Sequence, residues 1–385
     1  MRNPLSQKIT NIPHSGIRKF FEVAATMEDV ISLGVGEPDF DTPLKVRKEG
    51  IASLEQGHTT YTSNSGLQEL RDGVAAYMKR TIGIDYDTST EIVITVGGSE
   101  AIDATLRCML DPGDEVIVPE PAFVSYDPCT IMAGGVPVAI PLKNENQFKL
   151  TVEELAAAYT PKSKVLILSF PNNPTGAIMT KEDLAPIAEF AVENDLYVIS
   201  DEIYSELSYK GDHVSIASFP GMRDRTIIIN GFSKGFAMTG WRLGWVCGPE
   251  LIVAQVLKLH QYAIMCAPTT SQYAAIVAIN DCDEEVAMMR ESYNERRKYM
   301  LGEFERLGIS CFEPGGAFYL FPSIERFGLS SDDFAMRILQ EERLAVVPGT
   351  AFGASGEGFL RICYAYSMEE LKEAIIRLER FISKL

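Results

Sequence analysis

The sequence predicts an α/β protein in which a mostly parallel mixed sheet, flanked by helices, is joined to a smaller α+β domain. Two patterns predict this class. Between about residues 90 and 250, short apolar runs alternate with stretches of helical periodicity. From residue 283 onward, a long charged helical stretch is followed by shorter mixed elements. The length of 385 residues agrees with two cores, because one core stops growing at roughly 250 to 300 residues.

Five apolar runs indicate the strands of the sheet. They are rich in Val and Ile and end at Gly, Pro, Asn or Asp, which is typical of buried strands. The runs are EIVITVG (91–97), DEVIVPE (114–120), KVLILSF (164–170), LYVISDE (196–202) and TIIIN (226–230).

Two stretches between these runs predict helices that cover the sheet. Residues 99–110 and 181–195 carry apolar side chains at i, i+3 and i+4, the spacing of an amphipathic helix. Alternation of strands with helices favours parallel pairing. Ligands of such sheets bind at the carboxyl ends of the strands, where loops lead into the next helix.

The C-terminal part predicts a smaller domain. Helical stretches at 283–308, near 331–342 and at the C-terminus enclose the apolar segments GGAFYLFPSI, LAVVPGTAFG and GFLRICYA. We therefore divide the chain into a large domain at 46–282 and a small domain at 283–385. Residues 1–45 are expected to pack with the small domain.

Composition excludes several classes of function. A net charge of −18 and a pI near 4.8 oppose broad binding to nucleic acid or to an anionic membrane. Seven cysteines without a CxxC pair indicate neither a disulfide framework nor a zinc site. No run reaches the roughly 18 apolar residues of a membrane span, and no secretory signal opens the chain. We expect a cytoplasmic protein.

Polar residues follow four of the predicted strands. The segments are TVGGSEA (95–101), PNNPTG (171–176), SDEIY (200–204) and NGFSK (230–234). Because parallel strands share one carboxyl edge, we expect these four loops to meet at one crevice.

Two charged side chains, Lys234 and Asp201, fall in the segments that form this crevice, and their presence there needs a reason. A single loop lysine is more often exposed to solvent, and an aspartate after a strand is more often a helix cap. Lys234, however, lies in NGFSKGFAMTGWRLG among small and apolar residues, with Arg242 nearby in sequence. Burial and a nearby cation lower the pKa of a lysine and make it a nucleophile. A carboxylate at the tip of an apolar strand needs a cation or several donors.

The segment VGGSEA completes a cofactor pattern. Its glycines let the backbone approach an anion, Ser99 offers a hydroxyl, and the helix that begins there directs free N–H groups at the anion. Alone, the segment would be an ordinary helix start. A reactive lysine, a carboxylate for a protonated pyridine nitrogen and a phosphate loop together indicate a site for pyridoxal 5'-phosphate.

The ordered motifs identify a family. SFPNNPTG, SDEIYSEL, NGFSKGFAMTGWRLG and GFLRICYA, in this order, resemble the class I and II aminotransferases, which are pyridoxal-phosphate enzymes of fold type I in the aspartate aminotransferase superfamily. The resemblance extends to ISLGVGEPDFDTP, YTSNSGLQELR, LDPGDEVIVPEPAFVSY and PGGAFYLFP, and so covers essentially the whole chain.

The resemblance implies roles for the residues around the cofactor ring. Lys234 matches the lysine that binds the cofactor covalently and then moves the proton at the substrate Cα. Asp201 matches the partner of the pyridine nitrogen. Asn173 and Tyr204 match residues that hydrogen-bond the ring oxygen, and Phe123 matches the aromatic ring that stacks on the cofactor.

Further roles concern the phosphate and the substrate. Arg242 matches a phosphate ligand, together with Ser99 and the backbone of Gly98 to Glu100. Many members carry a hydroxyl three residues before the lysine, where this chain has Gly231, so Ser233 is the other candidate hydroxyl.

Arg361 matches the arginine that binds the substrate carboxylate, which a planar fork suits. Gly36 lies where the backbone approaches that carboxylate, although a turn before Pro38 explains it as well. Tyr61 matches a tyrosine that reaches the phosphate of the neighbouring subunit, which implies a homodimer with shared sites.

The implied reaction is ping-pong transfer of an amino group from an L-amino acid to a 2-oxo acid, with 2-oxoglutarate as the expected acceptor. The segments SGIRKF, AIDATLR and SDEIYSELSY most resemble bacterial enzymes that act on aromatic amino acids, aspartate or N-acetyl-diaminopimelate. Arg18 is a candidate for binding a distal carboxylate. Alternatives are a carbon-sulfur β-lyase, an aminocyclopropane-carboxylate-forming synthase and a non-catalytic regulator that binds the same cofactor.

Overall fold

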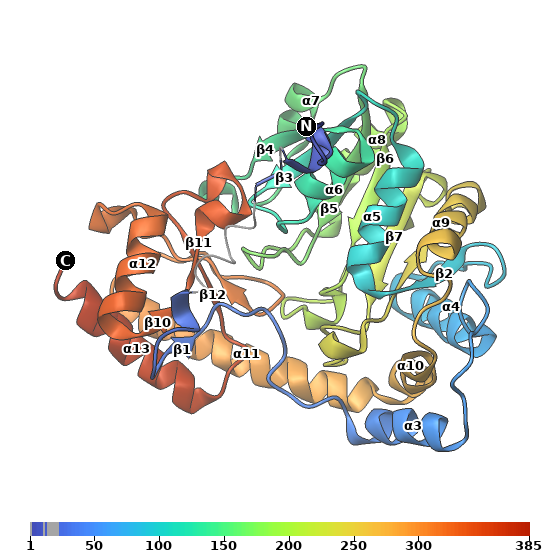
Figure 1. Cartoon of the computed structure of the whole chain (residues 1–385). Helices are drawn as coiled ribbons and strands as arrows, with labels where there is room; N and C mark the ends of the chain where they lie inside the picture. Colours follow the sequence, from blue (N-terminus) through green and yellow to red (C-terminus); the bar gives the residue numbers. More distant parts are fainter. Residues whose placement is uncertain (1, 11, 14–22) are drawn as a thin grey trace.

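The computed structural model describes residues 2–10, 12–13 and 23–385. Its centre is a seven-stranded mixed sheet with the order β2-β8-β7-β6-β5-β3-β4 (Figure 1). Strands β3, β4, β5, β6 and β7 are all parallel to one another. Strand β8 is antiparallel to both of its neighbours, β2 and β7. The strands are β2 (Ile92–Thr95), β3 (Glu115–Glu120), β4 (Val136–Pro141), β5 (Ser163–Ser169), β6 (Tyr197–Asp201), β7 (Thr226–Gly231) and β8 (Gly244–Cys247).

The α/β class and all five predicted strands are confirmed. Strands β4 and β8 were not predicted, for different reasons. The edge strand β4 contains Pro137 and Pro141 and is mostly unburied, so it lacks the signal of a buried strand. Strand β8 has only four residues and follows directly on the glycine-rich segment of Lys234.

Helices bury both faces of the sheet. Val165 and Ile167 of β5 belong to a core with α5 (Gly97–Met109) and α9 (Glu250–Ala263). Leu166 and Leu168 of the same strand belong to a core with α7 (Val152–Ala158) and α8 (Lys181–Glu193) on the other face. The continuous apolar runs of the sequence therefore reflect strands that are covered on both sides. Also beside the sheet are α4 (Gln68–Ile82), α6 (Tyr126–Ala133) and α10 (Thr269–Asp281), whereas α3 (Leu44–Glu55) packs on α10.

The C-terminal part builds a second, smaller layer, which the long helix α11 (Asp283–Arg306) joins to the rest (Figure 1). A three-stranded antiparallel sheet of order β11-β12-β9 packs there with the helices. The elements of this C-terminal part after α11 are β9 (Tyr319–Leu320), α12 (Ser331–Glu342), β10 (Leu344–Ala345), β11 (Val347–Pro348), β12 (Leu360–Cys363) and α13 (Met368–Ile382).

The N-terminal segment meets both parts of the protein, since its short helix α1 (Gln7–Thr10) packs on α6 and its strand β1 (Ile31–Ser32) meets the smaller part. Strand β1 pairs in parallel with β10. Before the chain enters α3, the carbonyl oxygens of Gly34 and Gly36 contact Arg361 of β12 and Lys234 after β7. The domain boundaries at 45 and 282 stay a prediction. None of the helices in the described part is both long and apolar enough to cross a membrane.

Candidate active site

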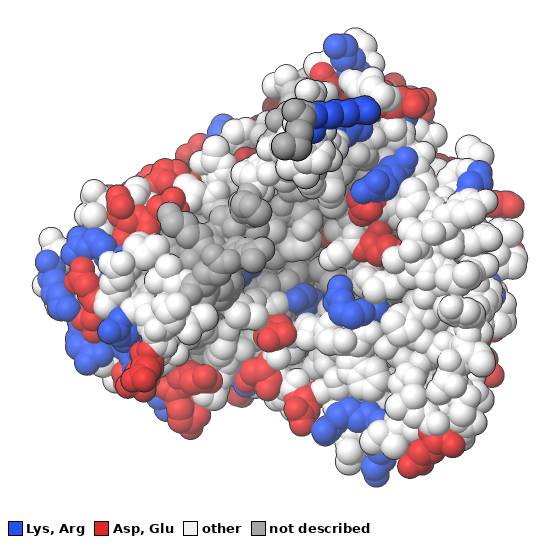
Figure 2. Space-filling view, in the orientation of Figure 1, with Lys and Arg blue, Asp and Glu red and all other residues white. Residues whose placement is uncertain are grey.

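A cavity of about 320 Å³ lies where the carboxyl ends of β5, β6 and β7 face the smaller part of the protein. Figure 2 shows this face hollowed at its middle, with basic side chains in and beside the hollow. The structure brings eleven of the residues singled out from the sequence to this cavity: Gly36, Gly98, Ser99, Phe123, Asn173, Asp201, Tyr204, Ser233, Lys234, Arg242 and Arg361. The predicted convergence of the four loops is confirmed.

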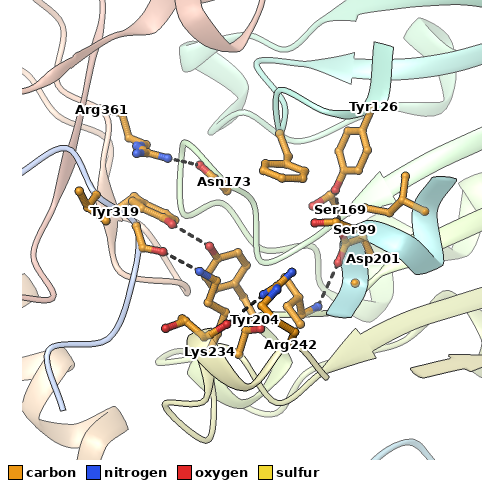
Figure 3. Close-up of a pocket in the computed structure, with 18 of the residues that line it drawn as sticks. Ser99, Tyr126, Ser169, Asn173, Asp201, Tyr204, Lys234, Arg242, Tyr319 and Arg361 are labelled. Atoms are coloured by element: carbon orange, nitrogen blue, oxygen red, sulfur yellow. Dashed lines mark hydrogen bonds between the residues drawn. The ribbon is translucent and has the colours of Figure 1, made fainter. Parts of the chain in front are cut away.

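Lys234 projects from the loop after β7 into this cavity (Figure 3). Its Nζ donates a hydrogen bond of 2.6 Å to the carbonyl oxygen of Gly36. Burial lowers the pKa of Lys234 to about 8, and the charges of Arg361 and Arg242 act in the same direction. The amine is therefore partly uncharged near neutral pH, as a nucleophile requires.

Asp201 ends β6 and is only 6% exposed. Its Oδ2 accepts a hydrogen bond of 2.7 Å from the Tyr126 hydroxyl, and its Oδ1 accepts one of 3.2 Å from the Ile203 N–H. Burial raises the pKa of Asp201 to about 6, while these two donors and the charge of Lys234 oppose the rise. A cationic partner in the cavity would keep the carboxylate ionised.

Arg361 comes from β12 on the opposite wall. Its Nη1 donates to Asn173 Oδ1 at 2.9 Å, and its Nη2 donates to the carbonyl oxygen of Gly34. The guanidinium carbon lies 4.6 Å from the ring centre of Tyr319 and 4.7 Å from that of Phe352. Within the described residues, its buried Nε has no hydrogen-bond partner. The fork is thus held in place with donor capacity left for an anion.

Tyr204 and Tyr319 connect these walls, since their hydroxyl oxygens lie 2.7 Å apart. A Cβ on Gly36 would lie 2.1 Å from the Tyr319 hydroxyl oxygen. The sequence left two explanations for Gly36, a turn or a close approach of the backbone. In the structure, glycine is required because Tyr319 occupies the place of a side chain.

An anion cradle forms where α5 begins. Gly97 has a φ of +76°, and a Cβ there would lie 2.8 Å from Arg242 Nη2, so the guanidinium rests against the glycine. Gly98 and Ser99, in the first turn of the helix, line the cavity. A Cβ on Gly231 would lie 2.9 Å from the Cα of Gly244, which explains why no hydroxyl stands at position 231.

Two of the predicted residues that the structure describes do not line the cavity. Glu100 turns its side chain toward His260, with Oε1 at 2.6 Å from Nδ1. Tyr61 is 79% exposed and does not line the cavity of its own chain. Arg18 lies outside the described residues.

The sequence reading missed Tyr126, Ser169, Thr239 and Tyr319, which also line the cavity. Tyr126 and Tyr319 occur in the quoted segments EPAFVSY and GGAFYLFP, where each could equally be a core aromatic. Only the contacts with Asp201 and Tyr204 reveal their place in the site.

The groups present fit a cofactor that carries an aldehyde and a phosphate. An amine of lowered pKa can attack the aldehyde, the cradle of Gly98, Ser99 and Arg242 can hold the phosphate, and Asp201 lies on another wall to pair with a ring cation. An α/β protein with this site belongs to the class of pyridoxal-phosphate enzymes.

Comparison with known proteins narrows the class. The sequence pattern of the family "Aminotransferase class I and II" matches residues 28–378. The chain is 49% identical over 384 residues to the putative aminotransferase YugH of Bacillus subtilis, covering 100% of both chains. It is 46% identical to an aspartate aminotransferase of Pyrococcus abyssi, covering 98% of each. The crystal structure of an aromatic aminotransferase from Pyrococcus horikoshii matches with a TM-score of 0.91 and 46% identity, over 96% of this chain and 99% of that one.

The chain belongs to the class I and II aminotransferases. It is therefore an aminotransferase that depends on pyridoxal phosphate, and the resemblance inferred from the motifs is confirmed.

The lowered pKa of Lys234 predicts that its amine reacts at a lower pH than an ordinary lysine. In enzyme freed of cofactor, the uncharged fraction of Lys234 should rise through about pH 8, because burial disfavours the charged form. Reductive methylation at several pH values, followed by peptide mass spectrometry, measures the midpoint. Modification that rises only near pH ~10.4, as for solvent-exposed lysines, would contradict the desolvation of this amine.

Proposed function

We propose that the enzyme transfers an amino group from an L-amino acid to a 2-oxo acid in two half-reactions that use the same cavity. The observation that carries this proposal is the placement of Lys234, Asp201 and Arg361 on three walls of one cavity. One bound substrate can therefore meet all three groups. They are a reactive amine, a carboxylate that pairs with a cation and a guanidinium fork that binds a carboxylate. Both substrates have a carboxylate next to the reacting carbon, so Arg361 serves both.

The cofactor supplies an aldehyde that takes up amino groups and a ring that withdraws electrons from the substrate carbon. Lys234 would hold the cofactor through its amine and would move the proton at the substrate Cα as general base and acid. Asp201, held by Tyr126 and the Ile203 N–H, keeps the ring nitrogen protonated. Tyr204 and Asn173 hydrogen-bond the ring oxygen.

The remaining residues bind and orient. Arg242, Ser99 and the backbone of Gly98 to Glu100 hold the phosphate, with Ser233 as a further hydroxyl. Phe123 covers one face of the ring. At the substrate end, Arg361 binds the carboxylate through a fork already fixed by Asn173 and Gly34. Gly36 contributes its backbone beside that carboxylate.

The substrates follow from the relatives rather than from a single side chain. Relatives of similar identity are named for aspartate and for aromatic amino acids. We propose a donor from the group formed by aromatic amino acids, aspartate and N-acetyl-diaminopimelate, with 2-oxoglutarate as acceptor. Arg18 is proposed to bind a distal carboxylate.

We also propose a homodimer in which Tyr61 of the partner subunit completes the phosphate site. Exposed apolar side chains occur on α3, which precedes this residue, and near the end of α9: Leu44, Ile51 and Leu54 are more than half exposed, and Tyr262 is 86% exposed. Thr269 donates to the carbonyl oxygen of Thr60 at 2.7 Å, so the Tyr61 segment is attached to the start of α10. A second copy would cover this apolar surface.

Two further expectations remain proposals. The chain divides into the large and small domains given above, with the cavity between them. All seven cysteines are unpaired, which agrees with a reducing compartment such as the cytoplasm.

The reaction is tested with a panel of amino donors against 2-oxoglutarate and pyruvate. The wild-type enzyme should convert the acceptor into its amino acid, and Lys234→Ala should abolish transfer because the amine that moves the proton is gone. Borohydride should fix the cofactor on Lys234, as peptide mass spectrometry would show. Release of pyruvate and ammonia from cystathionine, without transfer, would instead indicate a β-lyase.

Arg361→Ala should raise KM for amino donors by roughly 10- to 100-fold, the range for loss of hydrogen bonds to a charged group. The effect on kcat should be smaller, since the carboxylate is bound in the ground state and in the transition state alike. Arg361→Lys keeps the charge without the fork, so its KM should lie between those of the wild type and of Arg361→Ala. Steady-state kinetics separates these outcomes, and an unchanged KM in Arg361→Ala would contradict the assignment.

The shared site predicts complementation between subunits that each lack one part of it. Mixing Tyr61→Ala with Lys234→Ala chains should yield about a quarter of wild-type activity, because half of the dimers are mixed and one of their two sites is intact. Mixing Arg361→Ala with Lys234→Ala is the control, since both changes fall in the same chain's site and no intact site forms. Absence of any gain from the first mixture would show that Tyr61 acts within its own chain.

A further inference from the structure

Glu100 poses an electrostatic problem for the phosphate cradle. It lies in the first turn of α5, directly after Gly98 and Ser99, which line the cavity. Free N–H groups and the helix dipole attract negative charge to this end of a helix. A carboxylate on the same turn is attracted by the same groups, so it competes with a bound phosphate and also repels it.

The structure shows the Glu100 carboxylate turned away from the cavity. Its Oε2 accepts a hydrogen bond of 2.5 Å from the Val96 N–H, and its Oε1 lies 2.6 Å from His260 Nδ1. Glu100 does not line the cavity, although its two preceding neighbours do. Both oxygens of the carboxylate are therefore engaged behind the turn that faces the anion site.

His260 is the side chain that fixes this orientation. It is fully buried in the last turn of α9. Its backbone oxygen accepts hydrogen bonds from the N–H groups of Ile264 (2.8 Å) and Met265 (3.0 Å), which hold the end of the helix. Among the residues that the structure describes, its Nε2 has no partner, so Glu100 is the polar contact of the imidazole there. A proton on Nδ1 lets the imidazole donate to the carboxylate.

We propose that His260 is a positioning residue that restrains the Glu100 carboxylate, so that the first turn of α5 stays available to the phosphate of the cofactor. The proposal rests on the proposed function only in taking the anion to be that phosphate. Without the imidazole contact, the Glu100 carboxylate keeps only the Val96 N–H, so it can rotate toward the N–H groups of Gly98 and Ser99 and oppose the incoming charge. His260 contacts neither the cavity nor the substrate, and acts through Glu100.

The test compares two ligands of enzyme freed of cofactor, pyridoxal phosphate and pyridoxal, which lacks the phosphate. His260→Leu should weaken the binding of pyridoxal phosphate by about tenfold, which is the upper range for a charge at a helix terminus. The affinity for pyridoxal should stay unchanged. Dissociation constants from absorbance titrations give both values. The loss should shrink at high salt, which screens the repulsion.

A second change separates charge from packing. Adding Glu100→Gln to His260→Leu removes the released charge and should restore most of the affinity for pyridoxal phosphate. His260→Asn, which offers an amide donor close to the Nδ1 position, should lose less than His260→Leu. Equal weakening of pyridoxal and pyridoxal phosphate, or no recovery in the double variant, would overturn the proposal.

A matched pair at position 100 gives an answer even if His260→Leu does not fold. Glu100→Asp keeps the charge but is too short to reach His260 from the same backbone, whereas Glu100→Gln keeps the length without the charge. The aspartate variant should bind pyridoxal phosphate more weakly than the glutamine variant, and both should bind pyridoxal equally. Tighter binding of pyridoxal phosphate by the aspartate variant would contradict the proposal that His260 restrains the charge of Glu100. Absence of amino transfer in the wild-type enzyme would contradict the proposed reaction but not the role of His260.

Discussion

The desolvation of Lys234 is the constraint on which the site depends. A buried lysine that meets a carboxylate would stay protonated and unreactive, because the pair favours the charged form. The protein avoids this by offering a neutral acceptor, the carbonyl oxygen of Gly36, and by placing Arg361 and Arg242 where their charges oppose protonation. The buried carboxylate, Asp201, is held instead by Tyr126 and a backbone N–H. Opposite charges are thus kept in separate contacts within one cavity.

Glycine makes this arrangement sterically possible. Arg242 reaches the start of α5 because Gly97 has no Cβ in its way, and β7 approaches β8 closely because Gly231 and Gly244 face one another. Tyr319 fills the space beside Gly36 in the same manner. These positions bring large side chains close to backbone, so the shape of the cavity depends on residues that carry no functional group.

The sequence predicts the framework of the fold and the residues with distinctive chemistry. Buried strands give continuous apolar runs, so β2, β3, β5, β6 and β7 were found, whereas the proline-containing edge strand β4 gives no such signal. Asp201 was singled out as a carboxylate at the tip of an apolar strand, and Lys234 as a lysine among small and apolar residues. Asn173 was assigned because its motif resembles that of the family. Tyr126 and Tyr319 were missed because they act through partners 75 and 115 positions away in the sequence. The orientation of Glu100 likewise depends on His260, 160 positions away.

The path of the N-terminal segment limits how the enzyme can be shortened. Residues 34 to 36 supply the carbonyls that meet Arg361 and Lys234, and β1 just before them is tied to β10. A chain cut just before α3 would keep all seven strands of the central sheet and yet lose both acceptors. The lysine would then be free to find water or a carboxylate, and the arginine fork would lose one of its fixed contacts. The N-terminal segment is therefore part of the active site as well as of the fold, since Leu33 just before these carbonyls is buried in the core.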